Sequence, residues 1–151
     1  MFLVRPYAAE DRLFIFSLAP RLAAGMRPWR DLELWLASVD SWLAKSIDGH
    51  NQDAFVFIAE DESGERLGFA TVTRSTHFTG QPQAYLGELV TLESAEGGGV
   101  GTALVEACEQ WAREQGYRLL ALTTGAANTR ALSLYHKLGF QDEDVSLTKL
   151  L

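Results

Sequence analysis

The stretch ELVTLESAEGGGVGTALVEACEQW, residues 88–111, decides the fold. An apolar strand runs into a cluster of glycines, and the glycines lead directly into a helix with an apolar face. A helix N-terminus carries unpaired N–H groups and a partial positive charge, and glycines before it let an anion approach the backbone. The stretch therefore predicts an anion-binding loop, with a plain glycine-rich turn as the alternative.

Two common nucleotide sites do not fit these glycines. The segment lacks the Lys and the Ser or Thr that complete a P-loop. A dinucleotide fingerprint has a different glycine spacing and follows the first strand of a βαβ unit, whereas this cluster follows the fourth strand that we expect. A nucleotide-binding domain is therefore disfavoured.

The remaining chain alternates short β segments with helices. Periodicity and turn residues predict strands at residues 2–6, 54–60, 66–74, 84–92, 119–124 and 145–151, and helices at residues 10–22, 31–47, 99–115 and 129–138. Asp31 is placed to cap the second helix, and Gly116 to end the third. The crossover through the third helix predicts that strands 84–92 and 119–124 are parallel neighbours. The fold class is therefore a mixed α/β sheet.

Length and composition indicate one domain, residues 1–151, because 151 residues with 47% apolar content can bury a sizeable core. No apolar run approaches the ~20 residues that a membrane span needs, and the start of the chain lacks the features of a signal peptide. We expect a soluble, cytoplasmic protein that does not bind membranes.

The charge balance excludes other classes of protein. With 20 acidic and 13 basic residues, the formal net charge is −7 and no basic block is present, so nucleic-acid binding is not expected. A cationic small substrate would suit this charge, and the alternative is that the charge serves only solubility. The single cysteine, Cys108, and three histidines far apart in sequence predict no metal site. Cys108 lies on the apolar helix face and is expected to be a buried filler.

Three motifs resemble the GNAT superfamily of acyl-CoA-dependent N-acyltransferases. They are RP followed by ED near the start, the strand-loop-helix at residues 84–107, and NTRALSLYHKLGF at residues 128–140. The last is the most specific, since five of its residues stand at the family's spacing: Asn128, Ala131, Tyr135, Gly139 and Phe140. The resemblance implies a mixed, mostly antiparallel β-sheet with a central parallel strand pair flanked by helices. It also implies acetyl-CoA as co-substrate and no metal.

The resemblance also implies roles for particular positions. The CoA arm and pyrophosphate would be held by Leu89, Val90, Thr91, Gly97, Gly98, Gly99, Val100, Gly101, Thr102, Asn128 and Tyr135. A backbone N–H near Val90 would polarise the thioester carbonyl. Tyr135 would be the general acid that returns a proton to the CoA thiolate. Taken without the motif, Tyr135 could be a core aromatic and Asn128 a plain helix N-cap.

Glu88 is the candidate general base. Strand alternation puts it on one face with Leu86, Val90 and Leu92, so it would be a lone carboxylate among apolar neighbours. Desolvation would raise its pKa toward the range useful to a base. The alternative is a partly exposed glutamate paired with an arginine.

The tryptophans bear on the acceptor site. In the family that the chain resembles, the loop between the first two helices forms part of this site, and Trp29 in that loop is expected to line it. Trp35 and Trp42 fit the apolar stripe of the second helix and are expected in the core.

The sequence departs from the family's pattern in two places. The glycine loop begins with Glu96 where a basic residue or glutamine is usual, so Glu96 would weaken CoA binding if it points at the pyrophosphate, unless Arg130 compensates. The tail, residues 141–151, is shorter than the usual closing hairpin, which leaves the acceptor site open or completed by another chain in a homodimer.

The resulting prediction is an N-acetyltransferase that moves an acetyl group from acetyl-CoA to a primary amine by direct attack. The acceptor would be a small cationic amine or a protein amine. The alternative is a non-catalytic module of the same fold, acyl-CoA-binding or regulatory, in which Glu96 impairs CoA binding.

Overall fold

The computed structural model describes residues 1–151 and is built on one five-stranded sheet with the order β1-β2-β3-β4-β5. The strands are β1 (Phe2–Pro6), β2 (Ala54–Asp61), β3 (Arg66–Thr76), β4 (Pro82–Thr91) and β5 (Leu120–Ala121). The first four strands pair antiparallel, and β4 pairs with β5 in parallel. The predicted mixed α/β sheet, its hairpin and its parallel pair are confirmed.

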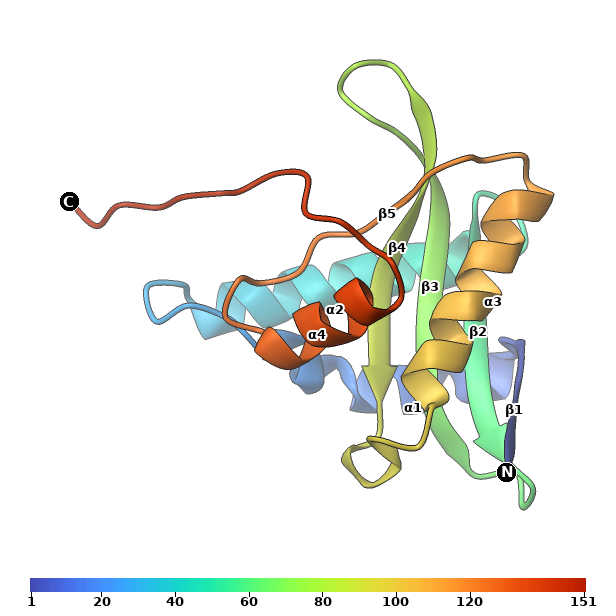
Figure 1. Ribbon diagram of the computed structural model, residues 1–151. Helices are drawn as coiled ribbons and strands as arrows, with labels where there is room; N and C mark the ends of the chain where they lie inside the picture. The colour runs from blue at the N-terminus through green and yellow to red at the C-terminus, as the bar shows by residue number, and fades with distance from the viewer.

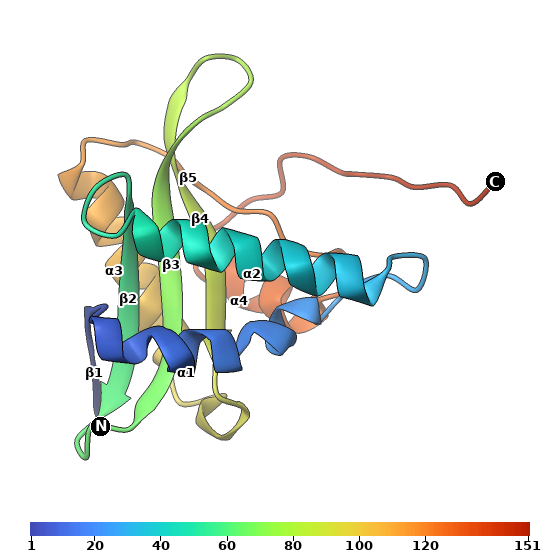
Figure 2. The same cartoon turned by 180° about the vertical axis from the view of Figure 1, so that it is seen from behind.

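Helices cover both faces of the sheet. They are α1 (Arg12–Ser17), α2 (Leu32–Asp48), α3 (Val100–Glu114) and α4 (Thr129–Lys137), with short 3₁₀ turns η1 (Ala9–Asp11), η2 (Ala19–Ala23) and η3 (Glu93–Ala95). Figure 1 shows α3 in front of the strands, and Figure 2 shows α1 and α2 on the opposite face. Asp31 caps α2 as predicted, because its carboxylate accepts the N–H of Leu34 at 2.9 Å.

Each face of the sheet carries its own core. The core under α3 includes Ala70, Val72, Leu86, Leu104, Cys108 and Trp111. The core under α1 and α2 includes Ile15, Val39, Leu43, Ile58, Phe69 and Val90. Cys108 is fully buried, as the apolar helix face predicted.

The predicted first helix at residues 10–22 is wrong as a single element. The segment is instead η1, α1 and η2, with Leu18 between the last two. Pro20 explains the break, because proline lacks the N–H that continues a helix and its ring clashes with the carbonyl one turn earlier. Arg21 belongs to η2, where it lies within hydrogen-bonding distance of Glu96, which follows η3.

The expectation that Trp42 is in the core is also wrong, since its side chain is 61% exposed. The buried stripe of α2 runs through Val39, Leu43 and Ile47, and Trp42 lies about 100° away from Leu43 around the helix. Trp35 is half-buried against this core, and its Nε1 donates to the carbonyl of Leu22 at 3.1 Å.

A β-bulge in β4 changes which side chains share a face. Thr71 on β3 pairs with Glu88, but the next residue, Val72, pairs with Leu86, so Gly87 is the extra residue. Leu86 therefore faces the core under α3, whereas Val90 faces the core under α1 and α2. The prediction that Glu88 and Leu86 share a face is wrong, because a bulge exchanges the two faces of a strand.

The C-terminal part is less regular than predicted. The strand expected at residues 119–124 is only Leu120–Ala121, and residues 145–151 form no strand. Beyond Ala121 the chain passes so close to Gly25 that a Cβ on Gly125 would lie 3.0 Å from the Gly25 carbonyl oxygen. The tail leaves the body of the molecule, and Arg30 donates to the Thr148 hydroxyl at 3.4 Å (Figure 1). None of the helices is both long and apolar enough to cross a membrane.

Asp11 ties the first strand to the sheet. It is fully buried, accepts Arg5 at 2.7 and 2.9 Å and Arg66 at 2.6 Å, and also accepts the Ala8 N–H at 2.8 Å. Burial alone would raise the pKa of Asp11, but these hydrogen bonds outweigh it and hold the pKa well below its usual range. The carboxylate therefore joins β1, η1 and β3.

Replacing Asp11 with Asn should lower the free energy of unfolding at pH 7 by about 3 kcal/mol, because two arginines would lose their buried counter-charge. Urea denaturation would measure the loss. The native contribution should itself fade as the pH drops, because a carboxylate with a depressed pKa contributes its full stability above the unfolded pKa and loses it as the pH falls through the folded pKa.

The matched control is Asp40→Asn on the exposed face of α2, which should change stability by less than about 0.5 kcal/mol. Equal effects of the two variants would contradict the linking role of Asp11.

Candidate functional site

A cavity of about 430 Å³ lies between β4, the start of α3 and α4. Pairing of β4 with β5 is confined to Ala84 with Leu120 and Tyr85 with Ala121, and the cavity is lined by the strand beyond that point. Ten of the predicted cofactor residues line it: Leu89, Val90, Thr91, Gly97, Gly99, Val100, Gly101, Thr102, Asn128 and Tyr135. Gly98, Glu88 and Trp29 do not.

The β4 backbone presents free polar groups to this cavity. The N–H of Leu92 donates to the carbonyl of Leu67 on β3 at 2.8 Å. The direction of the backbone N–H and C=O groups alternates along an antiparallel strand. The backbone groups of Val90 therefore also point toward β3, and those of Leu89 and Thr91 point toward the side where β5 no longer pairs. The N–H expected near Val90 to polarise a carbonyl is therefore that of Leu89 or Thr91.

The start of α3 offers further donors. Gly99 is the N-cap with φ of 86°, and no side chain caps the helix. The N–H groups of Val100, Gly101 and Thr102 have no partner within the chain, since the first capping bond is from Ala103 to the Gly99 carbonyl. Three free donors at the positive end of a 15-residue helix fit an anionic ligand.

Three cations and one carboxylate line the cavity: Arg21, Arg130, Lys137 and Glu96. Arg21 Nη2 donates to Glu96 Oε1 at 2.5 Å, and Arg130 Nη1 donates to Glu96 Oε2. The hydrogen bond from Arg130 lowers the pKa of Glu96 most. Burial opposes this shift, and the hydrogen bond from Arg21 and the charges of both arginines add to the lowering. Glu96 therefore carries its charge between two arginines. Sequence reasoning anticipated Arg130 but missed Arg21, which lies 75 positions from Glu96 and belongs to no motif.

Asn128 begins α4 at the edge of the cavity. Its Oδ1 accepts the N–H of Ala131 at 3.2 Å, which makes it the N-cap that the sequence allowed. The loop before α2 crosses here, because a Cβ on Gly25 would lie 2.7 Å from the Asn128 Cβ. The side-chain Nδ2 of Asn128 makes no hydrogen bond within the chain, whereas its backbone N–H donates to the Gly125 carbonyl at 2.9 Å, so capping leaves the side-chain donor for a ligand.

Tyr135 reaches the cavity from α4. Its side chain is 8% exposed and meets Phe140 edge-on, with ring centroids 5.6 Å apart. Burial raises the pKa of Tyr135 to about 12, so the hydroxyl keeps its proton at neutral pH.

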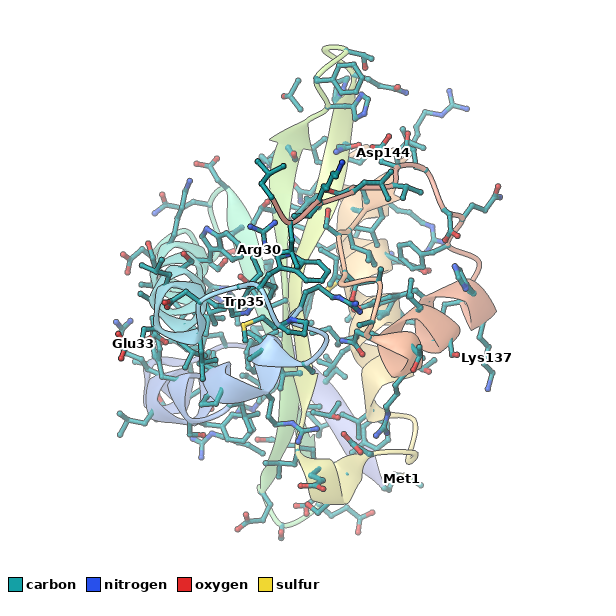
Figure 3. The ribbon with its side chains drawn as sticks, turned by 90° about the vertical axis from the view of Figure 1, so that its left-hand side faces the viewer. Met1, Arg30, Glu33, Trp35, Lys137 and Asp144 are labelled. Carbon is teal, nitrogen blue, oxygen red and sulfur yellow. The ribbon has the colours of Figure 1, made fainter.

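In the side view of Figure 3, Lys137 of α4 and Trp35 of α2 lie on opposite sides of the strands.

Glu88 lies on the other side of β4 from Leu89. It is 6% exposed, accepts the hydroxyl of Thr71, and donates its own N–H to Thr71 Oγ1 at 3.0 Å. Burial raises the pKa of Glu88, and the Thr71 hydrogen bond only partly offsets this. No arginine pairs with Glu88.

Trp29 lies in the loop before α2, away from the cavity lining. It is 38% exposed, and the Arg27 guanidinium stacks over its ring at 4.9 Å from the centroid. Its predicted place in an acceptor site stays a prediction.

The pattern of the acetyltransferase (GNAT) family matches residues 13–140 of this chain. That range holds every lining residue of the cavity and most of both cores. The chain belongs to the GNAT acetyltransferase family.

Curated relatives match the sequence of this chain over different lengths. Aminoglycoside N(6')-acetyltransferase type 1 of Klebsiella aerogenes is 36% identical over 95 residues, which cover 59% of this chain and 60% of that one. The alignments span only 46%, 64%, 33% and 60% of the first four curated relatives.

Solved structures show the same GNAT fold. A Pyrococcus furiosus protein regarded as an acetyl transferase has a TM-score of 0.79 at 20% identity, with both chains covered in full. A Clostridium acetobutylicum protein regarded as an acetyltransferase, solved with acetyl-CoA, has a TM-score of 0.66 at 20% identity, covering 99% of this chain and 96% of that one.

Glu88 should destabilise the fold at neutral pH. A raised pKa means that the folded state binds the proton more tightly, so the contribution to stability is full below the unfolded pKa and is lost as pH rises through the folded pKa. Glu88→Gln keeps an acceptor for Thr71 and should raise the Tm at pH 8 by roughly 2–4 °C, the shift that about 1 kcal/mol produces in a domain of this size.

Thermal unfolding from pH 4 to pH 8 would measure this effect, with the exposed Glu62→Gln as control. The difference in Tm between Glu88→Gln and the native protein should increase as the pH rises. A gap that is constant or narrows would contradict a buried, destabilising carboxylate.

Proposed function

We propose that this chain transfers an acetyl group from acetyl-CoA to a primary amine by direct attack of the neutral amine on the thioester. The observation that carries the proposal is a single cavity bordered by free β4 backbone, a free helix N-terminus and Tyr135. Both cores lie on one sheet, which supports treating residues 1–151 as one domain.

The lining of the cavity fits an acyl-CoA. The Arg21 Nε atom is buried without a hydrogen-bond partner, and the first turn of α3 has three unpaired N–H groups. Phosphate oxygens would satisfy such donors, while Leu89 and Thr91 would pair with the amides of the pantetheine arm as a missing strand would. Acetyl-CoA supplies the activated thioester, and family membership together with an acetyl-CoA-bound neighbour of the same fold favours it.

Tyr135 would act at the sulphur that leaves. With its pKa near 12 against about 8.5 for an ordinary thiol, complete proton transfer to a free thiolate would be uphill by about 5 kcal/mol. The hydroxyl would therefore act first as a hydrogen-bond donor to the developing sulphur charge, and its proton would move late in bond cleavage.

Glu88 would act on the amine. It lies on the face of β4 that looks toward α1 and α2, where the loop carrying Trp29 begins α2. Its raised pKa and its hydrogen bond with Thr71 suit a base that receives the amine proton directly or through one water. An amine arriving from this side would meet the thioester across the open part of the sheet.

The acceptor would be a small cationic amine or a protein amine. The chain carries a formal charge of −7, and only three of its 13 Lys and Arg residues line the cavity, so the net negative charge favours a cationic partner. The relative from Klebsiella aerogenes is named for an aminoglycoside, which supports the small-amine option.

The alternative function is a non-catalytic acyl-CoA-binding or regulatory module. It rested on an unopposed charge at Glu96, and the contacts of Glu96 with Arg21 and Arg130 weaken that basis. Titration calorimetry with acetyl-CoA, followed by acetylation assays on a panel of amines, separates the two. Binding without turnover on any amine would favour the module.

Tyr135→Phe should lower kcat by roughly 100-fold, since one proton donor contributes at least that much, while the Kd for acetyl-CoA changes less than about threefold. Steady-state kinetics and calorimetry would measure the two quantities separately.

The matched control is Tyr117→Phe, because Tyr117 packs against Trp111 and lies outside the cavity lining. This variant should keep the native kcat. Unchanged turnover in Tyr135→Phe would end the assignment of Tyr135 as the acid.

A further inference from the structure

Glu96 joins three parts of the chain that lie far apart in sequence. Arg21 comes from η2, Glu96 follows η3 at the start of the glycine loop, and Arg130 belongs to the first turn of α4. All three line the cofactor cavity. We infer that Glu96 is a positioning residue that holds Arg21 and Arg130 as a paired binding site for the phosphate groups of the acyl carrier. The inference rests on the proposed function.

The geometry leaves most of the arginine donors free. Each oxygen of Glu96 takes one arginine, Oε1 from Arg21 and Oε2 from Arg130. A guanidinium has five N–H donors, and each of these two spends a single nitrogen on Glu96. Arg21 Nε is buried and unpaired, which is unfavourable unless a ligand oxygen accepts from it. Both guanidiniums are therefore anchored and still able to bind an oxyanion.

The charge distribution points to an anion at this place. The chain has a formal charge of −7, yet the cavity lining carries Arg21, Arg130 and Lys137 against the single carboxylate of Glu96. The lining therefore has a formal excess of two positive charges. Guanidinium groups match phosphate oxygens in geometry and stay charged at every working pH.

The pair also replaces charge that the loop itself lacks. Residues 97–102 contain no Lys or Arg, so these residues offer no charged side chain to an anion. Arg21 of η2 and Arg130 of α4 bind Glu96, the residue directly before this range. A carboxylate between two guanidiniums relieves their mutual repulsion and restricts their rotamers, so they are presented to the ligand in place. The local charge of the three groups remains positive.

The pair should make the enzyme selective for phosphorylated acyl carriers. Acetyl-CoA has a diphosphate and a ribose phosphate, whereas acetyl-pantetheine has the same thioester arm and no phosphate. Arg21→Gln and Arg130→Gln should each lower kcat/KM for acetyl-CoA at least tenfold, and change kcat/KM for acetyl-pantetheine less than twofold. The control Arg113→Gln, on an exposed pair with Glu109, should change neither value.

Acetyl-dephospho-CoA identifies which phosphate is bound. If Arg21→Gln and Arg130→Gln lower kcat/KM for acetyl-dephospho-CoA by the same factor as for acetyl-CoA, the pair binds the diphosphate. If they lower it by a smaller factor, the pair binds the ribose phosphate. Either result supports the pair. The inference would be overturned if the kcat/KM of the arginine variants stayed within twofold of native for all three carriers. It would also be overturned if kcat/KM fell by the same factor for acetyl-pantetheine as for acetyl-CoA. Arg130 is 63% exposed, so Arg130→Gln keeps the test valid if Arg21→Gln unfolds.

Glu96→Gln tests the positioning role directly. It should raise the Kd for CoA severalfold by calorimetry, because the arginines lose their common anchor although one repelling charge is gone. A lower Kd would overturn the positioning role and make Glu96 a simple repulsive charge. If the native protein binds no acetyl-CoA, the proposed function fails as well; if it binds and the arginine variants bind equally, only the pair fails.

Discussion

The site depends on one constraint, the separation of β4 from β5 after only two paired residues. Backbone N–H and C=O groups away from water need partners, and beyond Tyr85 the outward groups of β4 have no strand beside them. A ligand arm with its own amides can take the place of that strand. The free first turn of α3 and the hydroxyl-bearing helix α4 border the same opening, so donor groups from three elements converge on a ligand that the sheet itself leaves room for.

Three buried or half-buried carboxylates show how environment decides what the same chemical group does. Asp11, held by Arg5 and Arg66, has a depressed pKa and joins strands. Glu96, between two arginines, also has a depressed pKa and borders the cavity. Glu88 is buried with one hydroxyl partner, and its pKa is raised. The carboxylate without a cation is the one suited to accept a proton, and those with cations are suited to hold structure.

Sequence periodicity predicted most elements, because caps, turns and apolar spacing are local signals. It could not predict the Gly87 bulge, since the mismatch with β3 exists only once both strands pair. It also predicted a strand at residues 145–151 from alternating apolar residues, but a strand needs a neighbour, and the chain turns away from β5 after α4. The predicted cofactor residues came from two contiguous motifs, residues 84–107 and 128–140, whereas Arg21 reaches the cavity from outside every motif.

One segment of the chain, residues 21–29, joins the cavity to the loop that carries Trp29. Arg21 binds Glu96 at the cavity, and four residues later Gly25, with φ of 82°, packs so tightly on Asn128 that no side chain fits between them. The same segment continues to Trp29 and the start of α2. Closely packed segments move together rather than deform freely. A displacement of Arg21 or Asn128 would therefore also displace the loop that carries Trp29. Residues 21–29 therefore connect the lining of the cavity to the loop that carries Trp29.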